Sequence, residues 1–171
     1  MMYLLRYAAP FVFDGHMNTK RSYGWIWKSL VAGLFGTIAH TLVVFLKVRA
    51  GWLPSFQPYQ ALQNTLSRLL SSEVPPIVPW MISYLNGMTI VGLLFGGSYR
   101  LLPGTYGITK GILVGILVWL IMGSLFFPLL GLGLFAWNLG LGVKPALFSL
   151  AMVLTYSTVM GVVYAALNAK A

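Results

Sequence analysis

The sequence predicts an all-α integral membrane protein with four transmembrane helices. Its mean hydropathy is +0.83, and only 8% of its residues are charged, against roughly a quarter in soluble proteins. Most of the chain falls into four long segments that contain no Asp, Glu, Lys or Arg: residues 29–46, 74–99, 111–143 and 145–169. A helix needs ~20 predominantly apolar residues to cross a bilayer. Each segment is therefore a candidate crossing.

The limits of the four spans follow from lysines, prolines and glycines. The first span, 29–46, lies between Lys28 and Lys47 and at 1.5 Å per residue reaches about 27 Å. The second covers 77–99, and the fourth covers 145–167. The third uncharged segment exceeds one crossing, so we expect its helix to run over 111–130, where Pro128 and several glycines end it. The remainder, up to Lys144, is predicted to be a partly buried interfacial or re-entrant loop.

The first connection is predicted to contain an amphipathic helix, about 56–72, lying in the membrane interface. Pro58 suits a first helical turn, and Pro75-Pro76 ends the segment. A polar loop is the alternative. The apolar residues recur at helical spacing, opposed by glutamines and other polar residues. They are Phe56, Tyr59, Leu62, Leu66, Leu69 and Leu70.

We divide the chain into an N-terminal segment, residues 1–27, and a four-helix transmembrane domain, residues 28–171. The N-terminal segment begins with the apolar run MMYLLRYAAPFVF. Neither a basic stretch before this run nor a small-residue cleavage site after it marks a signal peptide. We expect this segment to be retained and to dock on the membrane surface or on a partner.

An internal repeat is a second prediction. Aligning the first span with the third matches Lys28 to Lys110 and Gly33 to Gly115, and aligning the second with the fourth matches Gly92 to Gly161. The pattern indicates a duplicated two-helix hairpin, although apolar sequences also align by chance. Small residues at four-residue spacing let helix backbones approach closely. The predicted packing positions are Gly33, Gly92, Gly96, Gly111, Gly115 and Gly161.

The distribution of charge bears on the binding partners of the chain and on its orientation in the membrane. The net charge of +9 could indicate nucleic-acid binding, but the basic residues are spread over the ends of apolar segments, where lysine side chains reach the headgroups. Four crossings place both termini on one side. The basic residues on that side are Arg6, Lys20, Arg21, Lys28, Arg100, Lys110 and Lys170. The other side has Lys47, Arg49, Arg68 and Lys144. The positive-inside rule then places both termini in the cytoplasm.

Little in the predicted spans could perform chemistry. The chain has no cysteine, and both of its acidic residues, Asp14 and Glu73, lie outside the spans. Catalysis by paired carboxylates and proton relays therefore have no support. His40 lies near the middle of the first span and could bind haem iron or a chlorophyll magnesium, with Met122 aligned to it by the repeat. A neutral histidine that hydrogen-bonds a backbone carbonyl or a Thr or Ser of a neighbouring helix is the simpler explanation of His40, so no cofactor is the first expectation.

Three stretches carry a resemblance to a known group: WKSLVAGLFGTIAHTLVVFLK, LPGTYGITKGILVGILVWLIMGSLFFPLLGLGLFA and TYSTVMGVVYAAL. From about Lys28 onward the chain resembles an uncharacterised domain-of-unknown-function family of small four-helix bacterial inner-membrane proteins. The resemblance implies a four-helix membrane fold. It brings no activity, cofactor or site residues.

The expected function is that of a non-catalytic accessory subunit in a larger membrane complex, most plausibly a respiratory or photosynthetic electron-transfer complex. Its partners would be other membrane subunits and lipids, without nucleic acid, and its roles would be assembly, stability and lipid or quinone access. Two alternatives stay open. One is a haem- or chlorophyll-binding subunit that uses His40, and the other is a small oligomeric transporter or channel.

Overall fold

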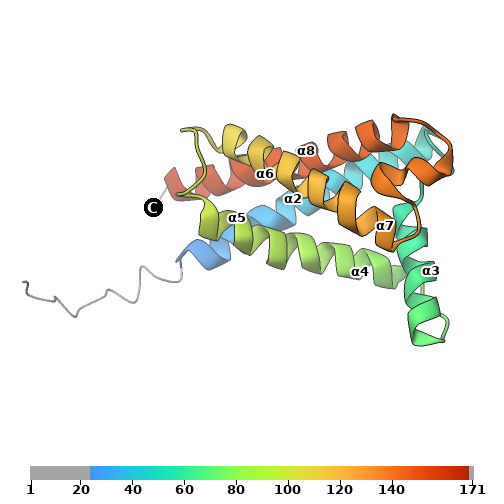
Figure 1. Ribbon diagram of the computed structural model, residues 1–171. Helices are drawn as coiled ribbons and strands as arrows, with labels where there is room; N and C mark the ends of the chain where they lie inside the picture. Colours follow the sequence, from blue (N-terminus) through green and yellow to red (C-terminus); the bar gives the residue numbers. More distant parts are fainter. Residues whose placement is uncertain (1–23, 170–171) are drawn as a thin grey trace, which may run out of the picture.

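The computed structural model describes residues 24–169 (Figure 1). The N-terminal segment predicted over 1–27 therefore lies outside the described residues, except for its last four positions, which begin the first helix. Within the described range all regular structure is helical.

Four helices are long and apolar enough to cross a membrane, which confirms the prediction of four helices. The first is α2 (Gly24–Arg49) and the last is α8 (Lys144–Ala169). Each runs a few residues beyond its predicted span, because the helix continues through the flanking lysines. The second span, Ile77–Ser98, is built of α4 (Ile77–Leu85), η1 (Asn86–Val91) and α5 (Gly92–Ser98). The third, Gly107–Leu129, is built of α6 (Gly107–Ile121), η2 (Met122–Phe126) and α7 (Phe127–Leu129).

The second and third spans each contain a π-helical turn, η1 and η2. Such turns are rare and are frequent at functional sites. In η2 the cause is local, because Pro128 lacks a backbone N–H and the hydrogen-bond ladder before it must adjust. In η1 the Tyr156 hydroxyl of α8 donates to the Gly87 carbonyl at 2.6 Å. That carbonyl therefore has a partner outside its own helix.

The helices α2 and α8 form the centre of the bundle (Figure 1). The pair is antiparallel, since Lys28 near the start of α2 contacts Asn168 near the end of α8. The second span packs on α2, and α6 packs on α8. Helix ends Gly24 and Ala169 therefore lie at the same end of the bundle.

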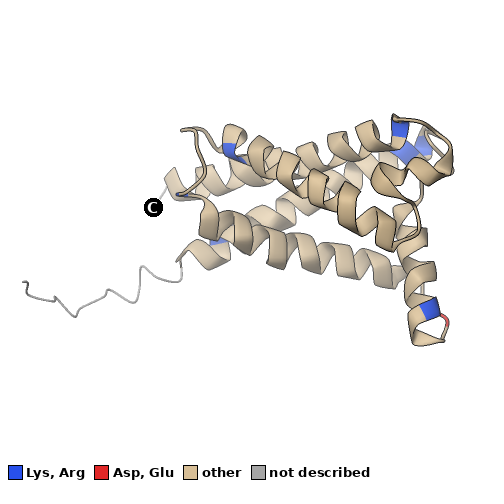
Figure 2. Cartoon of the chain, in the orientation of Figure 1, with Lys and Arg blue, Asp and Glu red and all other residues tan. Residues whose placement is uncertain are grey.

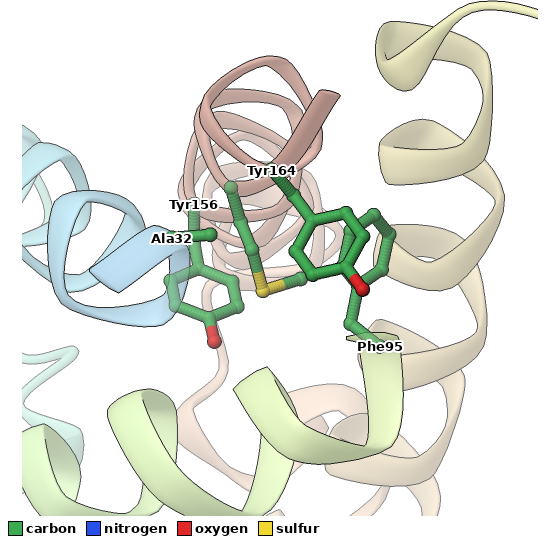
Figure 3. Close-up of a cluster of buried hydrophobic side chains, with 5 residues drawn as sticks. Ala32, Phe95, Tyr156 and Tyr164 are labelled. Atoms are coloured by element: carbon green, nitrogen blue, oxygen red, sulfur yellow. The ribbon is translucent and has the colours of Figure 1, made fainter. Parts of the chain in front are cut away.

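A cluster of buried side chains joins α2, α5 and α8: Ala32, Phe95, Tyr156, Met160 and Tyr164. Figure 3 shows the rings of Phe95 and Tyr164 side by side, and their centroids lie 5.6 Å apart at nearly a right angle. The Tyr164 hydroxyl donates to the Gly96 carbonyl at 3.3 Å. Buried tyrosines need such a partner, and here the partners are carbonyls of the second span.

The amphipathic helix is present as α3 (Pro58–Leu70), shorter than the predicted 56–72. Pro58 opens it, and Ser71, with φ of 50°, ends it in the left-handed conformation. Phe56 was predicted on its apolar face but precedes the helix and is fully buried. The far end of α3 projects from the bundle (Figure 1), where Leu69 and Leu70 are exposed.

Phe56 instead belongs to a second buried cluster, at the end of the bundle where α3 lies. It packs there with Phe127, Leu130, Leu132 and Ala136. The last three come from the segment 130–143, which contains the short helix η3 (Leu134–Leu139). This segment, predicted to be a partly buried loop, thus covers the cluster and shields part of its own backbone.

Candidate functional site

His40 lies on α2 at a small cavity where all four spans meet. The cavity measures about 100 Å³, and Asn86 of η1 and Thr37 of α2 line it. Ser83, Val118 and Tyr156 line it too, bringing in α4, α6 and α8. It is a crevice at the middle of the bundle whose walls combine polar side chains with valines.

The backbone of η1 comes close to α2 beside this crevice because Gly87 has no side chain. A Cβ at Gly87 would lie 2.5 Å from Thr37 Oγ1, well inside van der Waals contact. The Thr37 hydroxyl itself donates to the Gly33 carbonyl at 2.9 Å. The polar group of Thr37 is therefore satisfied within α2.

Two other polar side chains at the crevice have no such partner. Neither His40 nor Asn86 makes a side-chain hydrogen bond to another residue of the described range. Asn86 is exposed and His40 is half-buried, with the Tyr59 ring 6.5 Å away, centroid to centroid, in an edge-on arrangement. Both can donate and accept hydrogen bonds, so the crevice presents unfilled polar groups at mid-span.

The crevice is a poor site for the haem or chlorophyll considered for His40. Ligand pockets usually measure 300–1,000 Å³, several times its volume. Met122, which the repeat aligns with His40, packs instead against the cluster around Phe56. Across residues 24–169, no three His, Asp or Glu side chains come together to hold a metal ion.

All six glycines predicted as packing positions lie at contacts between helices. A Cβ at Gly33 would lie 2.7 Å from the Gly87 carbonyl oxygen, and one at Gly92 would lie 2.9 Å from the Ser29 carbonyl oxygen. The other four are equally close to a residue of a neighbouring helix: Gly96 to Ser29, Gly111 and Gly115 to Ser157, and Gly161 to Gly107. Equally close contacts at Gly36, Gly87 and Gly107 were not predicted from the sequence. Gly107 lies four residues before Gly111 and so continues the four-residue spacing of Gly111 and Gly115, a pattern that could have identified it.

Three lysines predicted to reach outward to lipid headgroups are buried instead: Lys28, Lys47 and Lys110. The Lys110 ammonium donates to the Tyr99 carbonyl at 2.7 Å and lies 4.2 Å from the centre of the Tyr99 ring. Lys28 donates to Asn168 Oδ1 at 3.1 Å. Tyr99 follows the last residue of α5, and carbonyls at helix C-termini lack intrahelical donors, so the Tyr99 carbonyl attracts the Lys110 ammonium inward. Figure 2 shows the basic positions confined to the two ends of the bundle.

A larger cavity, about 450 Å³, lies at the α3 end of the bundle. Lys47 of α2, Tyr59 of α3 and Trp80 of α4 line it, together with Phe148 and Met152 of α8. The Tyr59 and Trp80 rings are stacked with centroids 4.1 Å apart. Burial raises the pKa of the Tyr59 hydroxyl, which stays protonated and contacts Ser83 Oγ at 3.1 Å. The sequence analysis did not foresee this cavity, because its walls come from four separate segments.

Comparison with known protein families matches residues 24–171 to a family of unknown function, DUF6789. No curated protein and no solved structure matches the chain.

Proposed function

Because the chain belongs to this family of unknown function, we propose its role from its own geometry: a non-catalytic accessory subunit of a larger membrane complex. In this role a transmembrane helix of a partner subunit packs over the crevice, against the exposed faces of the second and third spans. His40 and Asn86 are the polar contacts for that helix.

The exposed, unpartnered Asn86 carries this proposal. An amide left without hydrogen bonds in hydrocarbon costs several kcal/mol. Asn86 lies ten residues into a 22-residue span, so the interfacial region is far from it. Hydrogen bonds between helices satisfy such groups in membrane proteins. A polar group on a partner helix, beside His40, would satisfy both side chains.

The surface around the crevice supports the same role. The second and third spans are the least buried of the four. Only 11% and 17% of the residues in their most apolar stretches are buried inside the protein. Both present apolar side chains along their length, as in Met81, Leu85, Ile90 and Leu94 of the second span and Ile112, Ile116 and Leu120 of the third. Lipid or a helix of a partner can cover these faces. Catalysis is not part of the proposal, because every described Lys, Arg and Glu lies near the ends of the bundle.

We further propose that the complex belongs to the electron-transfer class of a bacterial inner membrane, with both chain termini cytoplasmic. The proposed orientation is supported by the bias of basic residues toward one end and by the position of Gly24 and Ala169 at the same end of the bundle. Mass spectrometry of the chains that co-purify with the protein identifies the complex.

We also infer that the bundle is a duplicated hairpin. The repeat alignment matches Lys28 to Lys110 and Tyr99 to Asn168. Lys28 hydrogen-bonds Asn168, and Lys110 hydrogen-bonds Tyr99, so each hairpin's lysine holds the end of the other hairpin. Two-fold pseudosymmetry requires this reciprocity.

Residues that the alignment matches to one another also meet directly. Tyr156 bonds its counterpart Gly87, and Tyr164 packs on its counterpart Phe95, as expected close to a pseudo-two-fold axis. The turns after the first and third spans agree as well. Leu53 and its counterpart Phe135 both have φ of 48°, a value that is uncommon for residues with side chains.

Crosslinking in native membranes tests the partner proposal. A photoreactive amino acid at Ile90, one turn beyond Asn86 and 59% exposed, is expected to join the chain to a second polypeptide. The matched control is Leu147 on α8, 60% exposed, where lipid adducts are expected. Asn86→Leu should reduce the amount of that polypeptide that co-purifies. Lipid adducts alone at Ile90, together with unchanged co-purification of Asn86→Leu, would refute the proposal.

A further inference from the structure

We propose that the 450 Å³ cavity at the α3 end of the bundle binds a phospholipid, with the lipid phosphate on the Lys47 ammonium and one acyl chain along the apolar wall. This inference is independent of the partner docking proposed above, since it concerns the opposite end of α4 and different residues.

The charge of Lys47 is the first argument. Only 6% of the residue is exposed, and its ammonium donates to the Phe56 carbonyl. An ammonium has three N–H donors, so a carbonyl leaves both hydrogen-bonding capacity and a full positive charge. The only carboxylate of residues 24–169, Glu73, is exposed beyond the end of α3. A buried charge without a counter-charge is costly, and an anion in the cavity provides one.

The shape of the cavity is the second argument. Its volume falls within the range of ligand pockets, 300–1,000 Å³, and its inner wall is apolar, made by Val44, Phe148 and Met152. The outer part is polar and includes Gln60 and the exposed Trp52. An anion next to an apolar wall is the arrangement in a phospholipid. A free phosphate would leave the wall uncovered, and an uncharged quinone would leave the ammonium uncompensated.

The place of the cavity in the fold is the third argument. It lies at the C-terminal end of α2, and α3 runs across the ends of the spans there (Figure 1). If the four helices cross the bilayer, this is the level of the headgroups. Tryptophan side chains are enriched at that level, in agreement with Trp52 and Trp80 at the cavity.

The chain offers a matched control in Lys110. It is as deeply buried as Lys47, with 9% exposed against 6%, and it also donates to a backbone carbonyl. It lines neither cavity. Its ammonium lies 4.2 Å from the centre of the Tyr99 ring, whereas the Lys47 ammonium lies 5.5 Å from the centre of the Phe56 ring, so the ring offsets the charge of Lys110 more than that of Lys47.

The test measures lipid binding to the full-length purified protein by native mass spectrometry. The probes are phosphatidylglycerol, diacylglycerol and glycerol phosphate. Phosphatidylglycerol is expected to bind best, and Lys47→Gln is expected to weaken that binding tenfold or more, as the loss of a charged hydrogen bond does. Lys110→Gln should stay within twofold of the natural protein. Equal binding by Lys47→Gln, or equal loss in Lys110→Gln, overturns the site.

The other probes separate the sources of the phosphate. If diacylglycerol binds as well as phosphatidylglycerol, the phosphate has no role in binding. If glycerol phosphate binds as well as phosphatidylglycerol, the acyl chains have no role and the proposed lipid ligand is refuted. A second variant guards against misfolding of Lys47→Gln. Val48→Trp, at a cavity-lining position that is 68% exposed, should narrow the mouth and weaken binding. Leu46→Trp, 61% exposed and outside the cavity lining, should bind as the natural protein does.

Discussion

At the scale of single residues, glycine sets how closely α6 and α8 approach. A Cβ at Gly111 would overlap the Ser157 carbonyl, whereas one at Gly97 would make only ordinary contact with the Trp25 ring, at 3.7 Å. Both glycines lie inside helices, where alanine by itself favours the helix by up to ~1 kcal/mol. Comparing alanine substitutions at the two sites therefore separates the effect of helix packing from the effect of helix propensity.

We expect Gly111→Ala to lower the free energy of unfolding by about 1–3 kcal/mol, the usual cost of forcing an extra carbon into a packed contact. Gly97→Ala should be neutral or slightly stabilising. Thermal unfolding of the two detergent-solubilised variants measures the difference. Equal melting temperatures for both variants would show that α6 and α8 are not in the close contact described here.

Sequence patterns predicted which glycines lie at helix contacts better than they predicted the direction of the lysine side chains. Small residues at four-residue spacing directly indicate a close helix face, which is why Gly111 and Gly115 could be identified. The direction of Lys110 depends on where the Tyr99 carbonyl lies after the chain has turned back. No spacing in the sequence encodes that distance.

At the scale of elements, an aromatic contact fastens α3 to α4, and Ala61 and Leu62 of α3 also pack on the cluster around Phe56. Tyr59 stacks on Trp80 and contacts Ser83 Oγ, whereas Leu69 near the other end of the helix is 75% exposed. Aromatic pairs contribute ~0.5–1.5 kcal/mol beyond the area they bury. Loss of the ring should therefore loosen α3 much more than loss of the hydroxyl.

We expect Tyr59→Ala to raise amide hydrogen exchange across 58–70 by roughly tenfold, the factor that corresponds to 1.4 kcal/mol of local stability. Tyr59→Phe should raise it only severalfold, and Leu69→Ala should leave it unchanged. Exchange is measured by mass spectrometry in detergent micelles. If Tyr59→Ala exchanges like the natural protein, other contacts hold α3 in place.

Two features of these elements could not be predicted from the sequence: the position of Phe56 outside the helix and the π turn at η1. Helical periodicity extended the amphipathic helix back to Phe56, because a buried aromatic residue in a turn has the same spacing as one on a helix face. The π turn at η1 has no local marker beyond Gly87, and one carbonyl of the turn bonds Tyr156 of α8. Its existence depends on a helix that comes much later in the chain.

At the scale of the whole molecule, charge distribution sufficed to predict four crossings but not which helices are neighbours. The crossings were readable because Lys28, Lys47, Arg100, Lys110 and Lys144 lie at or near helix ends. That α2 pairs with α8 follows from side chains such as Tyr156, which is buried against Gly36. An uncharged helix offers little in its sequence to distinguish the face that meets a neighbour from the face that meets lipid.

The four crossings make a prediction about topology in the membrane. They place the connections after the first and third spans on one side, and the 99–106 connection and both chain termini on the other. A duplicated two-helix hairpin fits only this topology, because two crossings return the chain to the side on which it started. The chain has no natural cysteine, so single cysteines can report each side directly.

We expect Ser55→Cys and Val143→Cys to react with a membrane-impermeant maleimide added to intact cells, because the positive-inside bias places those connections outside the cytoplasm. Thr105→Cys should react only after the cells are opened. All three positions are exposed, so burial does not distinguish them. Opposite labelling of Ser55→Cys and Val143→Cys would rule out four crossings. Labelling of Thr105→Cys alone in intact cells would keep the four crossings but reverse the proposed orientation, so the number of crossings and the charge bias are tested separately by the same three variants.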